Sequence, residues 1–105
     1  MIIELDKTRD VKFTLGSIRK GKQTFGIGLM QMLSVEQMGP DNIVDLLWMG
    51  LLHEDPGLTR KSLDKIIEEW LNEPENQLNQ IDTVIVEALK ESKFLAVPGV
   101  AEKNS

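Results

Sequence analysis

The chain has 105 residues and a net charge of −5, with 41% hydrophobic and 28% charged residues. These values fit one globular domain, and the negative charge disfavours nucleic acid as a partner. The absence of cysteine excludes disulfides and thiolate metal sites and favours an intracellular protein. No apolar run approaches the ~20 residues of a membrane-spanning helix. The charged start MIIELDKTRD does not fit a signal peptide.

The N-terminal residues predict a β-hairpin. Residues 1–5 are rich in β-branched side chains, residues 6–10 are polar, and residues 11–13 alternate between apolar and polar. This pattern indicates two short strands joined by a turn. Because a two-stranded hairpin is marginally stable alone, it must lie on the helices or pair with another chain.

The next segment, TLGSIRKGKQTFGIGLMQML, predicts a weak helix. Thr14 can cap this helix, which we expect to end near Gly26. Gly16 and Gly21 inside it each cost about 1 kcal/mol relative to alanine. Residues 27–33 fit either a further helical turn or an apolar loop on the core, so the conformation of residues 15–38 stays open.

The fold is centred on the stretch from Asp41 to Leu71, which predicts a helix, a loop of five or six residues and a second helix. Gly39-Pro40 opens the first of these helices, with Pro40 at its first position. The first helix is apolar on most sides, so other elements must cover it. Asp55-Pro56-Gly57 ends it, and Thr59 caps the second helix. The second helix carries a single apolar stripe, formed by Leu63, Ile66, Ile67, Trp70 and Leu71.

The segment after Asn72-Glu73-Pro74 predicts a last helix, from Glu75 to about Phe94. Val84 and Val86 widen its apolar stripe, which indicates a second contact. We expect a single domain over residues 1–97 and a disordered tail over residues 98–105. The predicted fold class is mainly α, or small α+β, with an N-terminal β-hairpin followed by three to five helices around the central helix-loop-helix.

One cluster, His53-Glu54-Asp55, has residue types suited to catalysis or metal binding. Adjacent helical side chains diverge by ~100°, so these three do not converge. There is also no second histidine to complete a zinc site. The pattern favours a histidine in the last turn of its helix and an aspartate that begins the loop.

The remaining candidate motifs also favour structural roles. The basic run Arg19, Lys20 and Lys22 is typical of a solvated helix face, and the nearby glycines lack the order of a phosphate-binding loop. The acidic second helix does not fit a DNA-reading helix. Trp48 and Trp70 lie on apolar helix faces, which indicates core packing rather than a ligand cage. We therefore predict no catalytic, cofactor or metal site, and a chain that binds other proteins rather than an enzyme.

The order of the predicted elements and of the motifs between them resembles a known family of proteins. A hairpin leads into FTLGSIRK, a G-I-G-L turn enters an apolar helix, and LLWMGLLHEDPGLT precedes an acidic amphipathic helix. Over roughly residues 2–92, this order resembles the small tail assembly chaperones of long-tailed bacteriophages and their prophage relatives. The most specific piece is the apolar helix that ends in a His/Asp-Pro turn followed by a capping threonine.

The resemblance implies a non-catalytic assembly factor without a cofactor. Proteins of this family coat the long, apolar tape measure protein, keep it soluble, help to recruit tail tube subunits and leave before the virion is complete. The implied location is the bacterial host cytoplasm, and the protein is not expected in the mature virion. A frameshifted, C-terminally extended product is common in such phages, and the short polar tail would suit that junction. Many copies along one client would gain avidity, so a homo-oligomer is expected, with neither nucleic acid nor membrane as a partner.

Two sets of residues are candidates for contacts with other chains. We expect the client groove between the central and last helices, with these side chains serving as plain core in the alternative interpretation. The candidate client-binding residues are Trp48, Leu52, Ile85 and Leu89. Self-association is expected through the hairpin edge or the wider side of the last helix. The candidate self-association residues are Ile2, Leu5, Val84 and Val86.

Two other functions compete with an assembly chaperone. One is a small acidic adaptor or antitoxin-like regulatory protein that masks a basic partner. The other is a structural tail or head-completion protein, which would remain in purified particles. A chaperone gene should instead lie just upstream of a very long reading frame rich in helical repeats and carry a slippery heptamer near its stop codon.

Overall fold

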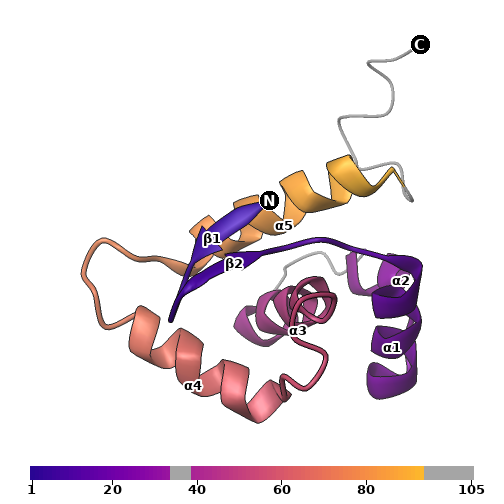
Figure 1. Cartoon of the computed structure of the whole chain (residues 1–105), viewed down its shortest axis with the longest axis horizontal. Helices are drawn as coiled ribbons and strands as arrows, with labels where there is room; N and C mark the ends of the chain where they lie inside the picture. The colour runs from indigo at the N-terminus through magenta and orange to yellow at the C-terminus, as the bar shows by residue number, and fades with distance from the viewer. Residues whose placement is uncertain (34–38, 94–105) are drawn as a thin grey trace.

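The computed structural model describes residues 1–33 and 39–93. It contains a two-stranded hairpin followed by helices, which confirms the predicted fold class (Figure 1). Phe94 and the predicted tail over residues 98–105 lie outside the described residues. The elements are β1 Ile2–Glu4, β2 Thr8–Asp10, α1 Leu15–Phe25, α2 Leu29–Leu33, α3 Pro40–Leu51, α4 Arg60–Trp70 and α5 Leu78–Ser92.

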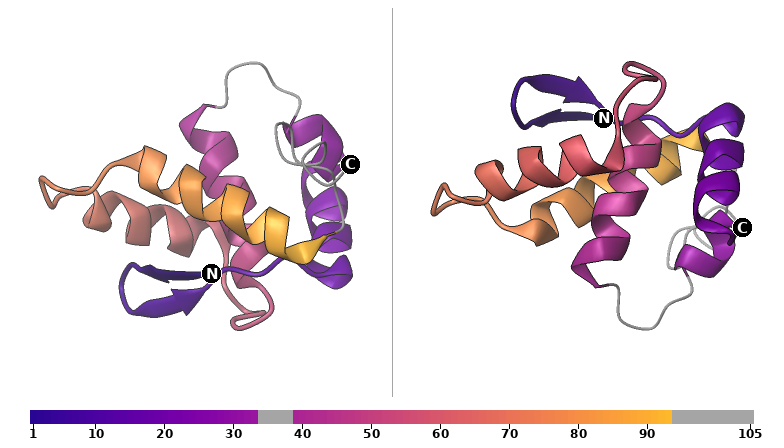
Figure 2. Two further views of the ribbon diagram at one scale, coloured as in Figure 1. Left: turned by 90° about the horizontal axis from the view of Figure 1, so that it is seen from above. Right: turned by 90° about the horizontal axis from the view of Figure 1, so that it is seen from below.

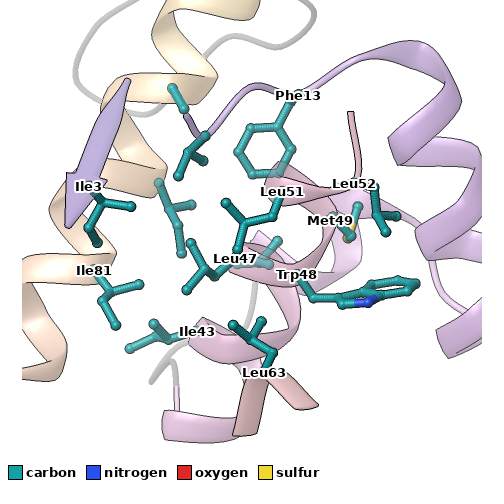
Figure 3. Packing of buried hydrophobic residues seen from close by; sticks show 14 of the residues in the cluster. Ile3, Phe13, Ile43, Leu47, Trp48, Met49, Leu51, Leu52, Leu63 and Ile81 are labelled. Atoms are coloured by element: carbon teal, nitrogen blue, oxygen red, sulfur yellow. The ribbon is translucent and has the colours of Figure 1, made fainter. Parts of the chain in front are cut away.

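Helix α3 is the centre of the molecule. It packs against α1, α4, α5 and β2, and the views from above and below show α1 and α4 on opposite sides of it (Figure 2). Because its apolar residues face several directions, only this multiple covering removes them from water. The core gathers around α3, with Phe13, Met49 and Leu51 close together in Figure 3 and all but inaccessible to solvent.

The helix ends follow the capping signals of the sequence. Thr14 Oγ1 accepts a hydrogen bond from the Ser17 backbone N–H at 3.0 Å, and the Thr14 N–H donates to Ser17 Oγ, so α1 begins with a capping box. Thr59 Oγ1 accepts from the Ser62 N–H at 3.0 Å at the start of α4. Pro40 opens α3, as predicted. Gly26, in the left-handed region at φ 78°, ends α1 at the predicted position.

The hairpin register differs from the prediction. Strand β2 is Thr8–Asp10, within the segment expected to be the turn, and Ile3 pairs with Arg9. Val11 and Phe13 are instead extended core residues beyond the strand, and both are buried. Their alternation resembles a strand because both side chains enter the core, whereas the actual strand contains a buried arginine that hydropathy does not predict.

Two glycines allow backbones to approach α3 closely. A Cβ on Gly50 would lie 2.6 Å from Val11 Cγ1, and a Cβ on Gly21 would lie 2.5 Å from Met49 Cε. The Lys12 N–H donates to the Gly50 carbonyl at 2.8 Å. The helix-weakening glycine of α1 at position 21 therefore has a packing role, which the sequence alone did not indicate.

Two connections are longer than predicted. The loop between α3 and α4 spans residues 52–59, and α5 begins at Leu78 rather than at Glu75. The residues before α5 form a turn in which Asn76 Nδ2 donates to the Trp70 carbonyl at 2.9 Å. The Glu73 N–H donates to the same carbonyl at 3.4 Å, so two groups beyond α4 satisfy a carbonyl that the helix itself leaves unpaired.

Candidate protein-binding surface

The four predicted client-binding residues lie in the core. Trp48 and Leu52 are at most 9% exposed, and Ile85 and Leu89 are at most 1% exposed. The prediction that they line a client groove between the two helices is wrong, because α5 packs directly on α3 and the apolar residues of both helices are buried against each other. Leu52 lines a separate hollow beside the start of α1. The alternative interpretation, plain core, describes them.

Trp48 shows how that part of the core is fixed. Its indole Nε1–H donates to the Leu58 carbonyl at 2.9 Å in a buried environment. The Phe25 ring meets it edge-on, with the ring centroids 5.6 Å apart. One side chain thus joins α3 to the loop before α4 and to the end of α1, which leaves it unavailable to a ligand.

The predicted self-association residues are more accessible. Ile2 is 57% exposed on β1, while Leu5 is half-buried against the core. Val84 and Val86 are half-buried on α5, and Val84 also touches the core cluster. Self-association through these residues stays a prediction.

The His53-Glu54-Asp55 segment holds the hairpin against the end of α3. His53 Nε2 lies 2.8 Å from the Asp10 carbonyl oxygen, and the Asp10 N–H donates to Glu54 Oε1 at 3.0 Å. Asp55 Oδ2 lies 3.5 Å from Nη1 of Arg9, which is 4% exposed. The three side chains therefore contact three different groups of β2, namely the Asp10 carbonyl, the Asp10 N–H and the Arg9 guanidinium. They do not converge on a common point.

The buried arginine is held mainly by Asp6. Arg9 Nε donates to Asp6 Oδ1 at 2.8 Å, and Nη2 donates to Oδ2 at 2.9 Å, a bidentate pair. The hydrogen bond from Arg9 holds the pKa of the Asp6 carboxyl below its ordinary value of 3.8. Among residues 1–33 and 39–93, no cluster of three or more acidic or histidine side chains is arranged to bind a metal ion.

A different surface has the shape of a binding site. A groove of about 550 Å³ lies where the first half of α3, the length of α4 and the start of α5 meet. We call it the α4 groove. Apolar side chains from all three helices lie among the charged ones. Its lining consists of Pro40, Asp41, Val44, Asp45, Arg60, Lys61, Asp64, Ile67, Glu68, Leu71 and Leu78.

The α4 groove has a negative charge. Its lining has four carboxylates and two cationic side chains, a formal charge of −2. One of the cations, Arg60, is already engaged. Its Nε lies 3.5 Å from Asp45 Oδ1, and its guanidinium carbon lies 4.5 Å from the centre of the Phe25 ring. Lys61 is therefore the cation left to balance the remaining three carboxylates.

Asp45 reports the electrostatic environment of the α4 groove. Its side chain is 21% exposed. Partial burial raises the pKa of Asp45 above its ordinary value of 3.8, and the nearby carboxylates of Asp41 and Asp64 raise it further, against the opposing effect of Arg60. The effect of Asp41 and Asp64 on Asp45 shows that the carboxylates of the groove lie close enough to repel one another, and a positive charge on a partner would reduce this repulsion.

A second acidic hollow serves as a comparison. It has about 400 Å³ and lies between the hairpin turn and the end of α4. Glu69 and Glu73 lie on it beside the half-buried Trp70. Neither glutamate lines the α4 groove, so the two surfaces can be altered separately.

The sequence did not predict the α4 groove. Ile67 and Leu71 were assigned to the apolar stripe of α4, and the exposed Asp64 and Glu68 lie beside that stripe. The sequence feature closest to the groove is Leu71, the last residue of the stripe. In the structure this leucine is 39% exposed. What helical periodicity lacks is the angle at which α3, α4 and α5 meet.

No helix in the described part of the chain is both long enough and apolar enough to cross a bilayer. Comparisons with protein-family models, curated protein sequences and solved structures found no significant match for the chain.

Proposed function

We propose that the protein is a non-catalytic assembly chaperone of the phage tail type. In this role it binds and solubilises the tape measure protein, helps to recruit tail tube subunits in the bacterial host cytoplasm, and leaves before the virion is complete. The observation that carries the proposal is the α4 groove, an apolar hollow with an acidic rim on a small helical domain. Such a surface suits the capture of an apolar segment of another protein.

The motif that carries the family resemblance supports the proposal through its structural role. The HEDPGLT segment fixes the hairpin to α3 through His53 and Glu54 and caps α4 through Thr59. It therefore sets how α4 lies on the rest of the domain, and α4 supplies one whole side of the groove. A resemblance centred on this segment thus concerns residues that position the proposed binding surface.

Solubility of the client tests the proposal. The chain is co-expressed with the product of the long helical-repeat reading frame expected downstream of its gene, and the soluble fraction of that product is measured with and without the chain. The proposal expects a soluble client that co-purifies with the chain. A client that is equally insoluble in both cases would refute it.

A second measurement separates the chaperone from a structural tail protein. Purified particles are examined for the chain by mass spectrometry. A chaperone is absent from mature particles, whereas a tail or head-completion protein is present at a fixed copy number.

A further inference from the structure

One face of α4 forms a continuous strip along the α4 groove. Asp64, Ile67, Glu68 and Leu71 all line the groove, and their spacing of i, i+3, i+4 and i+7 places them on one side of the helix. The strip rises along the helix by about 10 Å. Its two apolar members alternate with its two carboxylates, so any occupant must present apolar and polar groups side by side.

The walls of the groove favour a helical occupant over an extended one. They are built from three helices, in which most backbone N–H and C=O groups bond to one another. An extended peptide needs backbone partners from its host, as it finds at a sheet edge, and helix sides do not offer them. A helix satisfies its own backbone and needs only side-chain contacts.

The charge of the groove favours basic flanks on that helix. Arg60 lies between Asp45 and Phe25 and is 47% exposed, so Asp45 balances part of its charge within the domain. Asp41, Asp64 and Glu68 are exposed on the rim. An acidic helix would be repelled by this rim, and a neutral helix would leave the repulsion among the rim carboxylates unrelieved.

We propose that the α4 groove binds an amphipathic helix of a partner protein, one with aliphatic side chains on a single face and lysine or arginine beside them. This inference rests on the proposed protein-binding function and adds the chemistry of the bound segment and the surface that receives it. The aliphatic side chains pack on the accessible apolar lining, which is Leu71 with the half-buried Val44 and Leu78, above the buried Ile67. The basic side chains pair with the carboxylates of the rim.

A synthetic peptide provides the first test. The probe has about 18 residues, five helical turns, with leucine on one face and lysine on both flanks. Two controls accompany it: one with glutamate in place of every lysine, and one with the same composition in scrambled order. Binding to the isotopically labelled protein is followed by NMR. We expect amide shifts concentrated at the groove, binding that weakens with added salt, and no binding of the glutamate peptide. Equal binding of the scrambled peptide, or shifts spread over the whole surface, would overturn the inference.

Matched charge reversals provide the second test. The groove variant Asp64→Lys/Glu68→Lys is compared with the control variant Glu69→Lys/Glu73→Lys, which changes net charge equally but alters the second hollow. All four side chains are exposed, so both variants should fold, and circular dichroism verifies this. We expect the groove variant to bind the lysine peptide at least about tenfold more weakly and the control variant to change by less than about threefold. Equal weakening would show that only net charge matters and would overturn the inference.

A third variant tests the apolar part of the groove. Leu71→Ala removes an exposed leucine with little effect on stability, and we expect about threefold to tenfold weaker peptide binding, because a few buried methylene groups are lost from the contact. Unchanged affinity would contradict packing of the peptide on this side of the groove.

Failure of this inference can be distinguished from failure of the proposed function. If the wild-type chain keeps the tape measure protein soluble and the groove variant does so equally well, the client binds elsewhere and the inference fails alone. If the wild-type chain leaves that protein insoluble but binds the lysine peptide in the groove, the chaperone proposal fails and the groove takes basic helices of another partner.

Discussion

Replacement of Gly50 by alanine tests how the segment that follows the hairpin, Val11 to Phe13, packs on α3. We call this segment the hairpin exit. The added Cβ would lie 2.6 Å from Val11 Cγ1, and Val11 is fully buried, β-branched and stiff at χ1. The segment cannot simply withdraw, because the Lys12 N–H bonds to the Gly50 carbonyl at 2.8 Å. Overpacking of this kind costs about 1–3 kcal/mol, and alanine regains about 1 kcal/mol in helix propensity. We expect a net loss of up to about 2 kcal/mol in the free energy of unfolding.

The matched control is Gly16→Ala, near the start of α1. A Cβ there would meet Thr14 Oγ1 at 3.8 Å, an ordinary contact. This variant should gain about 0.4–1 kcal/mol, because alanine restricts the unfolded chain. Urea unfolding followed by circular dichroism measures both variants. A Gly50→Ala variant as stable as Gly16→Ala would refute the close approach of the hairpin exit to α3.

Three further changes test the fold. Trp48→Phe removes the donor to the buried Leu58 carbonyl and should lower the free energy of unfolding by about 1–3 kcal/mol; an unchanged urea midpoint would argue against that bond. Thr59→Ala should cost about 1 kcal/mol through loss of the N-cap, whereas Thr59→Ser should retain most of it. Asp6→Asn tests the Arg9 pair, because the lowered pKa of Asp6 means that its ionised form stabilises the fold above pH 3.8 and that this contribution disappears as pH falls through the lowered pKa. The variant should therefore be less stable than wild type at pH 7 and approach it in acid, and a difference independent of pH would contradict this.

The helices were predictable because their ends carry local chemistry. Thr14 and Thr59 can accept hydrogen bonds from backbone N–H groups a few residues later, and Pro40 fits a first helical position. The exit from α1 at Gly26 follows from the same reasoning, because glycine adopts the left-handed conformation without strain. Signals of this kind act within one or two turns of helix, so one sequence contains all of the information they need.

The hairpin was predicted as an element but with its second strand in the wrong place. Its register depends on Arg9, whose burial is supported by Asp6 in the turn and by Asp55 some 46 residues away. A pattern of apolar alternation cannot detect a buried ion pair of this kind. The prediction therefore placed the second strand at Val11 to Phe13, whereas the strand is Thr8–Asp10, directly before that segment.

The predicted client groove was wrong for a related reason. A surplus of apolar residues on α3 and α5 can be satisfied by a partner or by each other, and sequence periodicity does not distinguish these cases. The structure pairs the two helices, which places Ile85 and Leu89 inside. Leu71, at the end of α4, is instead one of the large apolar side chains that stay exposed, and it lies in the groove where α3, α4 and α5 meet.

The most direct test of this account is the solubility of the co-expressed tape measure protein in the presence of three forms of the chain. These are the wild type, Asp64→Lys/Glu68→Lys in the α4 groove, and Glu69→Lys/Glu73→Lys outside it. We expect a soluble client with the wild type and the control variant and an aggregated client with the groove variant. Equal solubility with all three forms, or none with any of them, would contradict it.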